Sequence, residues 1–141
     1  MESFSLNIKF IGFIEKHNSK VYESRKLSDL IGEKKKPKKR IEIITYLEKG
    51  EIVISWMGYF EDNETGDILS PDCYYTDGNY IWPSYLIYYL KKYPNFKLEK
   101  QFIDYLEKAN FLFPSVSKNK IKLLESNFSK ILVSNAPLRR R

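Results

Sequence analysis

The single Cys73 and the single His17 are the residues that could support covalent catalysis, as a thiolate nucleophile with a histidine base. That chemistry requires the base within hydrogen-bond distance of the nucleophile and a third group that orients the base. Cys73 opens an apolar strand pattern, where a cysteine usually serves as a small buried hydrophobe. The sequence contains no phosphate-binding loop, dinucleotide-binding fingerprint or nucleophile elbow. We therefore expect a protein that is not an enzyme and has no catalytic residue.

A second chemical possibility is a cation site in the acidic segment Asp62-Asn-Glu-Thr-Gly-Asp67, which looks like the first half of a calcium loop. Gly66 and Cys73 stand where such a loop needs an oxygen ligand and a bidentate glutamate. One histidine and one cysteine cannot supply a zinc site with its usual ligands. Asp, Asn, Thr and Gly are ordinary turn residues. The segment therefore predicts a solvated acidic turn, with no metal and no cofactor.

Charge is segregated along the sequence. The net charge is +6, yet no Lys or Arg occurs between Lys49 and Lys91, a stretch that contains seven carboxylates. The basic loop before it can neutralise phosphates, so nucleic-acid binding is the alternative function. This loop lacks the interleaved aromatic residues on which single-stranded bases stack. The residues that the alternative would use are Lys34, Lys35, Lys36, Lys38, Lys39 and Arg40.

The segment from Cys73 to Tyr93 is the one that must position the rest of the chain. Asp77 and Gly78, between aromatic and β-branched residues, predict a tight hairpin turn that pairs Thr76 with Asn79. Alternation along the two strands would place four side chains on one face. They are Cys73, Tyr75, Tyr80 and Trp82. Pro83 suits the start of a helix, and an apolar stripe at helical spacing continues from there. The stripe consists of Leu86, Tyr89, Leu90 and Tyr93.

The remaining pattern predicts one α+β domain over residues 1–133, with a small antiparallel sheet of about three strands and four to five helices. A strand is expected over residues 51–60, with Gly58 marking a bulge or a close backbone approach. A mobile basic loop is expected over residues 18–39 and a frayed basic tail over residues 134–141. Besides the helix over residues 83–93, helices are expected over residues 6–17, 41–47, 98–109 and 121–131.

Several aromatic residues of the central segment are expected at the surface. Tyr85 and Tyr88 fall outside the apolar stripe of their helix, and Tyr74 lies on the hairpin face opposite to Trp82. Exposed tyrosines beside carboxylates are typical of protein-binding surfaces, because tyrosine offers a large contact area at a low entropy cost. The predicted partner-binding residues are Glu61, Asp62, Glu64, Asp67, Tyr74, Tyr85 and Tyr88.

Several features favour a cytoplasmic protein. No apolar run approaches the roughly 18 residues that would span a membrane. The first residues lack the basic and apolar pattern of a secretion signal. A single cysteine cannot form an internal disulfide.

The order of residues 41–50, the acidic turn, and Asp77-Gly-Asn-Tyr-Ile-Trp-Pro83 resembles a class of small bacterial cytosolic domains with an Asp-Gly-x-x-x-Trp-Pro signature. Members of that class are often immunity-type proteins associated with polymorphic toxin loci. The resemblance covers roughly residues 5–110 and implies an α+β protein that neutralises a toxin domain by stoichiometric contact. The net basic charge departs from the acidic character expected of an inhibitor of nucleic-acid-cleaving toxins. The stretch Glu51–Asp77 would supply a local negative face.

Overall fold

The computed structural model describes residues 8–31, 38–62 and 64–134. Within them, four strands and six helices confirm the predicted α+β fold, with slightly more elements than the pattern predicted. In chain order the elements are β1 (Lys9–Phe10), α1 (Glu15–Asn18), α2 (Leu27–Leu30), α3 (Arg40–Leu47), β2 (Glu51–Glu61), β3 (Ile68–Thr76), β4 (Tyr80–Pro83), α4 (Tyr85–Lys92), α5 (Lys100–Lys108) and α6 (Lys118–Ser134).

The four strands form one sheet in the order β1-β4-β3-β2. Strands β2, β3 and β4 are antiparallel neighbours, whereas β1 pairs with β4 in parallel, with Phe10 opposite Ile81. The helix predicted over residues 6–17 is therefore wrong. The backbone N–H of Ile11 bonds to the carbonyl of Ile81 at 3.1 Å. Only Glu15–Asn18 are helical, because this distant strand edge supplies the hydrogen bonds that a helix would have made locally.

The hairpin forms at the predicted place, but with a larger turn. Thr76 pairs with Ile81 and not with Asn79. The Thr76 hydroxyl and the Asp77 carboxylate bond to backbone groups within the turn, and such local bonds hold four residues where two were expected. The register moves by two residues, so every side chain keeps its predicted face. Tyr75 lies opposite Trp82, and the Cys73 thiol donates to the Tyr75 hydroxyl.

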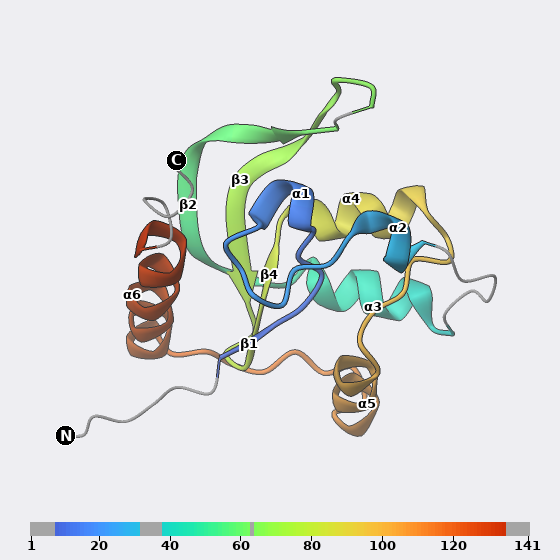
Figure 1. Cartoon of the computed structure of the whole chain (residues 1–141). Coiled ribbons are helices and arrows are strands. Elements are labelled where there is room, and N and C mark those ends of the chain that lie inside the picture. Colours follow the sequence, from blue (N-terminus) through green and yellow to red (C-terminus); the bar gives the residue numbers. More distant parts are fainter. Residues whose placement is uncertain (1–7, 32–37, 63, 135–141) are drawn as a thin grey trace.

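Both faces of the sheet are covered, as Figure 1 shows: α6 lies on one side of the strands, and α3, α4 and α5 lie on the other. Ring contacts join the layers. On the first side, Phe128 of α6 packs against Tyr74, Phe10 and Phe13. On the second side, Phe102 of α5 packs against rings of β4 and α3. These rings are Tyr80, Trp82 and Tyr46.

The predicted helices α3, α4, α5 and α6 are confirmed within a few residues of their expected bounds. Helix α4 begins at Tyr85, two residues later than expected, because Pro83 still pairs with Tyr74 as the last residue of β4. The segment predicted as a loop over residues 18–39 contains α2, and Val21 and Leu30 are buried in the core. The expectation of a loop is therefore wrong for α2. Residues 32–37 and 135–141 lie outside the described residues.

Candidate binding surface and an adjoining hollow

The acidic turn between β2 and β3 is built around Asp62, which is only 4% exposed. Its Oδ1 atom accepts the backbone N–H groups of Glu64 at 2.8 Å and Thr65 at 3.3 Å. The backbone of Asp62 also bonds to Gly66 and Asp67 across the turn. Asp62 therefore organises the turn, while the other predicted carboxylates on it are exposed. These are Glu61, Glu64 and Asp67.

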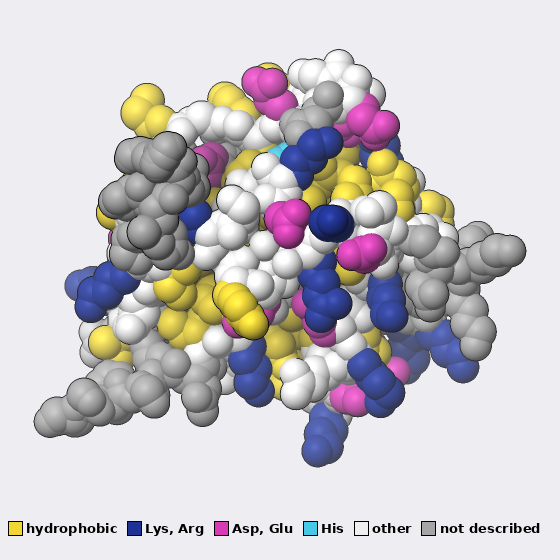
Figure 2. Space-filling view, in the orientation of Figure 1, with side chains coloured by type: hydrophobic (Ala, Val, Ile, Leu, Met, Phe, Trp, Pro, Cys, Tyr) yellow, Lys and Arg dark blue, Asp and Glu magenta, His cyan; other side chains and the backbone are white. Residues whose placement is uncertain are grey.

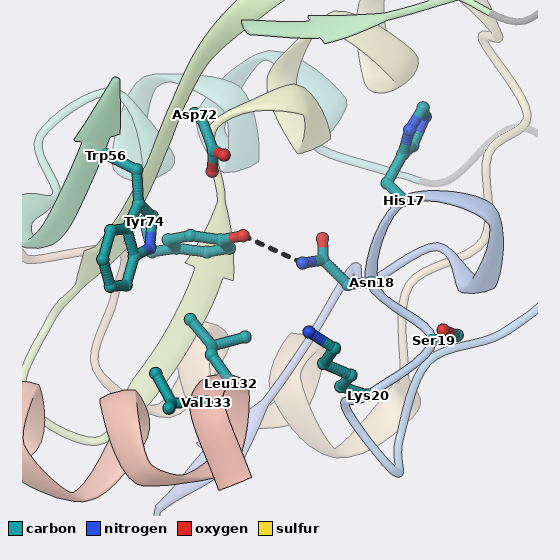
Figure 3. Close-up of a pocket in the computed structure, with 9 residues that line it drawn as sticks. All are labelled: His17, Asn18, Ser19, Lys20, Trp56, Asp72, Tyr74, Leu132 and Val133. Carbon is teal, nitrogen blue, oxygen red and sulfur yellow. Dashed lines mark hydrogen bonds between the residues drawn. The ribbon is translucent and has the colours of Figure 1, made fainter. Parts of the chain in front are cut away.

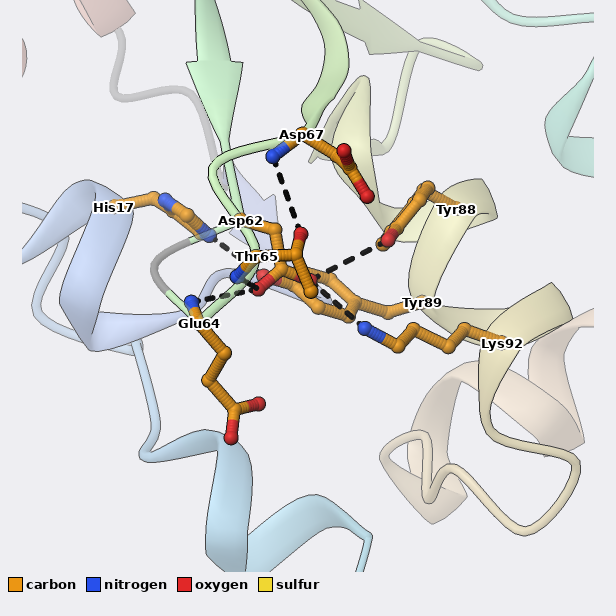
Figure 4. A network of polar contacts seen from close by, with 8 residues as sticks. All are labelled: His17, Asp62, Glu64, Thr65, Asp67, Tyr88, Tyr89 and Lys92. Atoms are coloured by element: carbon orange, nitrogen blue, oxygen red, sulfur yellow. Dashed lines mark hydrogen bonds and ion pairs between the residues drawn. The ribbon is translucent and has the colours of Figure 1, made fainter.

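The second oxygen of Asp62 ties the turn to α4 (Figure 4). Lys92 donates to Oδ2 at 2.8 Å, and the hydroxyl of the half-buried Tyr88 donates at 3.3 Å. The bond from Lys92, followed by that from the Glu64 N–H, holds the pKa of Asp62 at about 2. His17 shares a hydrogen bond with Tyr89 at 2.8 Å beside this network. Burial, and then the charge of Lys16, lowers the pKa of His17, whereas Asp62 opposes that shift.

Tyr74 and Tyr85 are not at the surface, so their predicted exposure is wrong. Tyr74 is 3% exposed and Tyr85 is 0% exposed. The prediction assumed one covered face of the hairpin and one covered stripe of α4. Residues of α1 and the segment before it cover the other side. The Tyr85 hydroxyl donates to Asn18 Oδ1 at 2.6 Å and accepts the Ile14 N–H, and Asn18 donates to Tyr74 at 2.8 Å.

Cys73 and His17 are held by separate partners. Cys73 is buried and donates to Tyr75, whereas His17 bonds to Tyr89 and packs against the ring of Tyr85. Over the part of the chain that the structure describes, no hydrogen bond joins the thiol to the imidazole. Within those same residues, no three His, Cys, Asp or Glu side chains gather in a way that could hold a metal ion.

The basic run is only partly described. Lys34, Lys35 and Lys36 fall outside the described residues, and Lys38 and Lys39 are exposed. Arg40 has a structural contact instead: its guanidinium donates to the carbonyl of Leu90 at 2.8 and 3.1 Å and to that of Lys91 at 3.3 Å. These carbonyls end α4 and lack partners within the helix. Arg40 therefore joins α3 to the end of α4.

Strand β2 presents apolar side chains that sequence reasoning missed. It is an edge strand of the sheet, and its exposed large hydrophobics, together with one on β3, form what we call the arm surface. These residues are Ile52 (55% exposed), Trp56 (44%), Met57 (98%), Tyr59 (63%) and Ile68 (63%). The strand over residues 51–60 was predicted, but the exposure of its apolar side chains was not. The usable signal was the run Trp56-Met-Gly-Tyr59, in which apolar residues occupy both faces around a glycine.

A β-bulge shapes this surface, which is one of the two roles expected for Gly58. The other role, a close backbone approach, is absent among the described residues, since none of their atoms beyond the chain neighbours lies within 4 Å of the position that a Cβ would take there. Ser55 pairs with Cys73 and Tyr59 pairs with Pro71, so residues 56–58 of β2 lie opposite Asp72 alone. Gly58 has φ +107°, a conformation that other residues rarely adopt. Bulges bend a strand and redirect its side chains. Here the bulge places Trp56 and Asp72 at one point of the sheet.

Trp56 and Asp72 line a hollow of about 310 Å³ (Figure 3). Its other walls come from the end of α1 and the segment after it, from Tyr74 and from the last turns of α6. Asp72 Oδ1 is buried and has no hydrogen-bond partner. Burial raises the pKa of Asp72, and the Tyr74 hydroxyl partly offsets that shift.

Comparison with family models, curated proteins and solved structures found no match to this chain. The structure adds one general finding: over the described residues, no helix combines the length and the apolar character needed to cross a membrane. The arm surface, the acidic turn and the hollow are therefore the candidate functional regions of this protein.

Proposed function

We propose that this protein is a non-catalytic binding protein of the immunity type, which acts in the cytoplasm and neutralises a toxin domain by covering part of its surface. The contact would be made by the arm surface and the acidic turn beside it. The proposal needs no cofactor and no catalytic residue. It agrees with the class that the Asp-Gly-x-x-x-Trp-Pro segment resembles.

The observation that carries the proposal is the concentration of exposed apolar side chains on one edge of the sheet. Met57 is 98% exposed, and Ile52, Tyr59 and Ile68 are each more than half exposed. Exposing several large hydrophobic residues on one element costs solubility and favours aggregation, so such patches usually mark an interaction site. Aromatic residues and methionine are also enriched at protein interfaces.

Charge supports a basic partner. The exposed carboxylates Glu61, Glu64 and Asp67 lie at the end of β2 and on the turn to β3, beside the arm surface. Residues 50–90 contain no Lys or Arg. In Figure 2 most Lys and Arg side chains lie over the lower half of the molecule, and Lys92, which contacts the β2–β3 turn, is paired with Asp62. An apolar centre with a charged rim of one sign is a common interface design, in which the rim charges accelerate association.

The proposed function requires a toxin domain encoded beside this protein's gene, and the test is a binding experiment with that domain. The variant W56S/M57S should bind that domain at least about tenfold more weakly, because truncating central interface side chains typically costs 1–2 kcal/mol or more. Tyr22→Ser and Leu112→Ser are matched controls, since Tyr22 and Leu112 are 96% and 72% exposed but lie outside the arm surface. Both controls should bind normally.

A charge variant separates the two parts of the surface. Replacing Glu61, Glu64 and Asp67 by Lys should slow association and change its salt dependence, with a smaller effect on dissociation. A neighbouring toxin domain that forms no complex with the wild-type protein would refute the immunity function. Equal binding by wild type and W56S/M57S would refute the arm surface as the contact.

A further inference from the structure

The hollow beside the arm surface combines a carboxylate, an aromatic ring and an apolar wall. Because residues 56–58 lie opposite Asp72 alone, Trp56 and Asp72 both border the hollow. Leu132 and Val133 of α6 form a second wall, and the Tyr74 hydroxyl and the Asn18 amide face the same space in Figure 3. The bulge, and not the regular sheet, brings these groups together.

Asp72 is the residue whose unsatisfied hydrogen-bonding capacity indicates a ligand. Its Oδ1 atom is buried and has no hydrogen-bond partner, and among its neighbours the Tyr74 hydroxyl only partly offsets the rise in its pKa that burial causes. A buried polar atom without a partner costs free energy, and nearly all such atoms in native proteins have one. A donor supplied from outside would remove that cost.

The remaining walls favour a planar cation. Trp56 is 44% exposed, so part of its ring is available for contact. A guanidinium group stacks on aromatic faces and donates two parallel hydrogen bonds to a carboxylate, which an ammonium group cannot do. The volume of about 310 Å³ lies at the lower end of the range for ligand sites, roughly 300–1,000 Å³. It suits one side chain better than a cofactor.

We propose that this hollow binds the guanidinium group of an arginine side chain presented by a partner protein. Asp72 accepts its N–H groups, Trp56 covers its face, and Leu132 and Val133 contact its methylene groups. The source of the arginine rests on the proposed function, because Trp56 belongs to the arm surface that would meet the partner. The arginine would anchor the edge of that contact.

Lys20 also lines the hollow and could suggest an anion site instead. It has an interaction of its own. Lys20→Met distinguishes the two possibilities. If the hollow binds guanidinium, the variant removes a competing cation and should bind blocked arginine more tightly. If the hollow binds anions, the variant loses its binding group and should bind acetate more weakly.

The chain contains two tryptophans, which makes a direct measurement possible. Trp56 borders the hollow, and Trp82 is 0% exposed on the other face of the sheet. The full chain labelled with 5-fluorotryptophan is titrated with arginine blocked at both ends, N-acetyl-arginine amide, and followed by fluorine NMR. The Trp56 signal should shift and saturate in the millimolar range, while the Trp82 signal should stay in place.

Variants assign the binding to Asp72. Asp72→Asn should weaken binding at least about tenfold, since it removes the charge that the guanidinium pairs with. Asp67→Asn, an exposed carboxylate on the turn, should leave it unchanged. Equal binding by Asp72→Asn and wild type would overturn the proposal, as would a saturating shift with sodium acetate in place of the blocked arginine.

Two further titrations identify the source of the guanidinium group. Tenfold tighter binding of free L-arginine than of the blocked form would indicate a metabolite site and overturn the partner source. The chain itself ends in Arg139, Arg140 and Arg141, so the titration is repeated with R139Q/R140Q/R141Q. No saturating shift in either protein would overturn the site. Complex formation between the wild-type protein and the toxin domain tests the proposed function separately, because the titration with blocked arginine uses no partner protein. W56S/M57S alters Trp56 and therefore affects both the arm surface and the hollow.

Discussion

Two aspartates on one hairpin, Asp77 and Asp72, differ in the number of hydrogen bonds that their carboxylates accept. Asp77, directly after β3, is 1% exposed and accepts four hydrogen bonds. The backbone N–H groups of Asn79 and Tyr80 donate to Oδ1 at 2.9 and 2.8 Å. The hydroxyls of Tyr46 and Tyr105 donate to Oδ2 at 2.5 and 2.9 Å. Asp72, within β3, has a buried Oδ1 atom without a hydrogen-bond partner, and only the Tyr74 hydroxyl partly offsets the effect of burial on its pKa.

The difference separates scaffold from candidate site. Tyr46 belongs to α3 and Tyr105 to α5, so the Asp77 carboxylate joins two helices to the hairpin turn. Each tyrosine opens a Tyr-Leu-Glu-Lys segment, and the two segments meet at one carboxylate oxygen. A carboxylate that is saturated in this way specifies the fold. Asp72 does not join elements of the fold by hydrogen bonds as Asp77 does. We therefore look for a functional reason for a carboxylate at this position.

The largest effect should come from Asp77→Ala. The change leaves two backbone donors and two hydroxyls without their acceptor, and each buried donor that finds no partner costs about 1–3 kcal/mol. We expect the free energy of unfolding to fall by at least about 3 kcal/mol. Urea unfolding followed by tryptophan fluorescence measures it.

Single-donor variants calibrate that result. Tyr105→Phe removes one donor from a half-exposed position and should cost about 1 kcal/mol. Should Asp77→Ala lose no more than Tyr105→Phe does, the four-donor arrangement would not be a main support of the fold.

Much of this fold could be predicted because its signals are local. The stripe at Phe102 and Leu106 identified α5 by helical spacing, and Asp77-Gly78 identified the hairpin. The N-terminal strand could not be predicted in this way. The period-two pattern of Ile8 and Phe10 was present, but the pairing that makes it a strand is with β4, some seventy residues away. A nonlocal parallel pairing leaves no periodicity of its own in the sequence.

The candidate site was less predictable for the same reason. Glu61, Glu64 and Asp67 are exposed as expected, but Asp62 is buried by its own turn and by Lys92 of α4. Burial of Tyr85 depends on Asn18 and Ile14, which pack from a distant part of the chain. Gly58 did indicate the bulge, yet only the register shows that Asp72 stands opposite it.

Asp62 is intermediate between the two aspartates in how its carboxylate is satisfied. It has hydrogen-bond partners, but one of them, Lys92, is partly exposed to solvent. Its folded pKa of about 2 lies below the ordinary 3.8. The charged form is therefore favoured by folding, so its stabilisation is present above pH 4 and is lost as the pH falls from about 4 to about 2. Asp62→Asn keeps an oxygen for the turn but loses the charge that binds Lys92.

We expect Asp62→Asn to be moderately less stable than wild type at pH 6 and equal to it near pH 2. Urea midpoints measured across that range give the comparison, with Asp67→Asn as an exposed control. A difference between wild type and Asp62→Asn that does not change with pH would show that the Lys92 pair contributes nothing through charge.

The smallest effect on stability, and the most informative one, is expected for Asp72→Asn. Burial raises the pKa of Asp72, so its native form binds a proton more readily than the unfolded form does. Its charge therefore costs stability above the ordinary pKa and costs nothing once both states are protonated. The variant should be as stable as wild type at pH 7 or slightly more stable, because partial solvent exposure reduces the cost of the charge. That advantage should disappear near pH 3. A loss of stability close to that of Asp77→Ala would mean that Asp72 is a second scaffold carboxylate, and the contrast between the two aspartates would no longer separate scaffold from site.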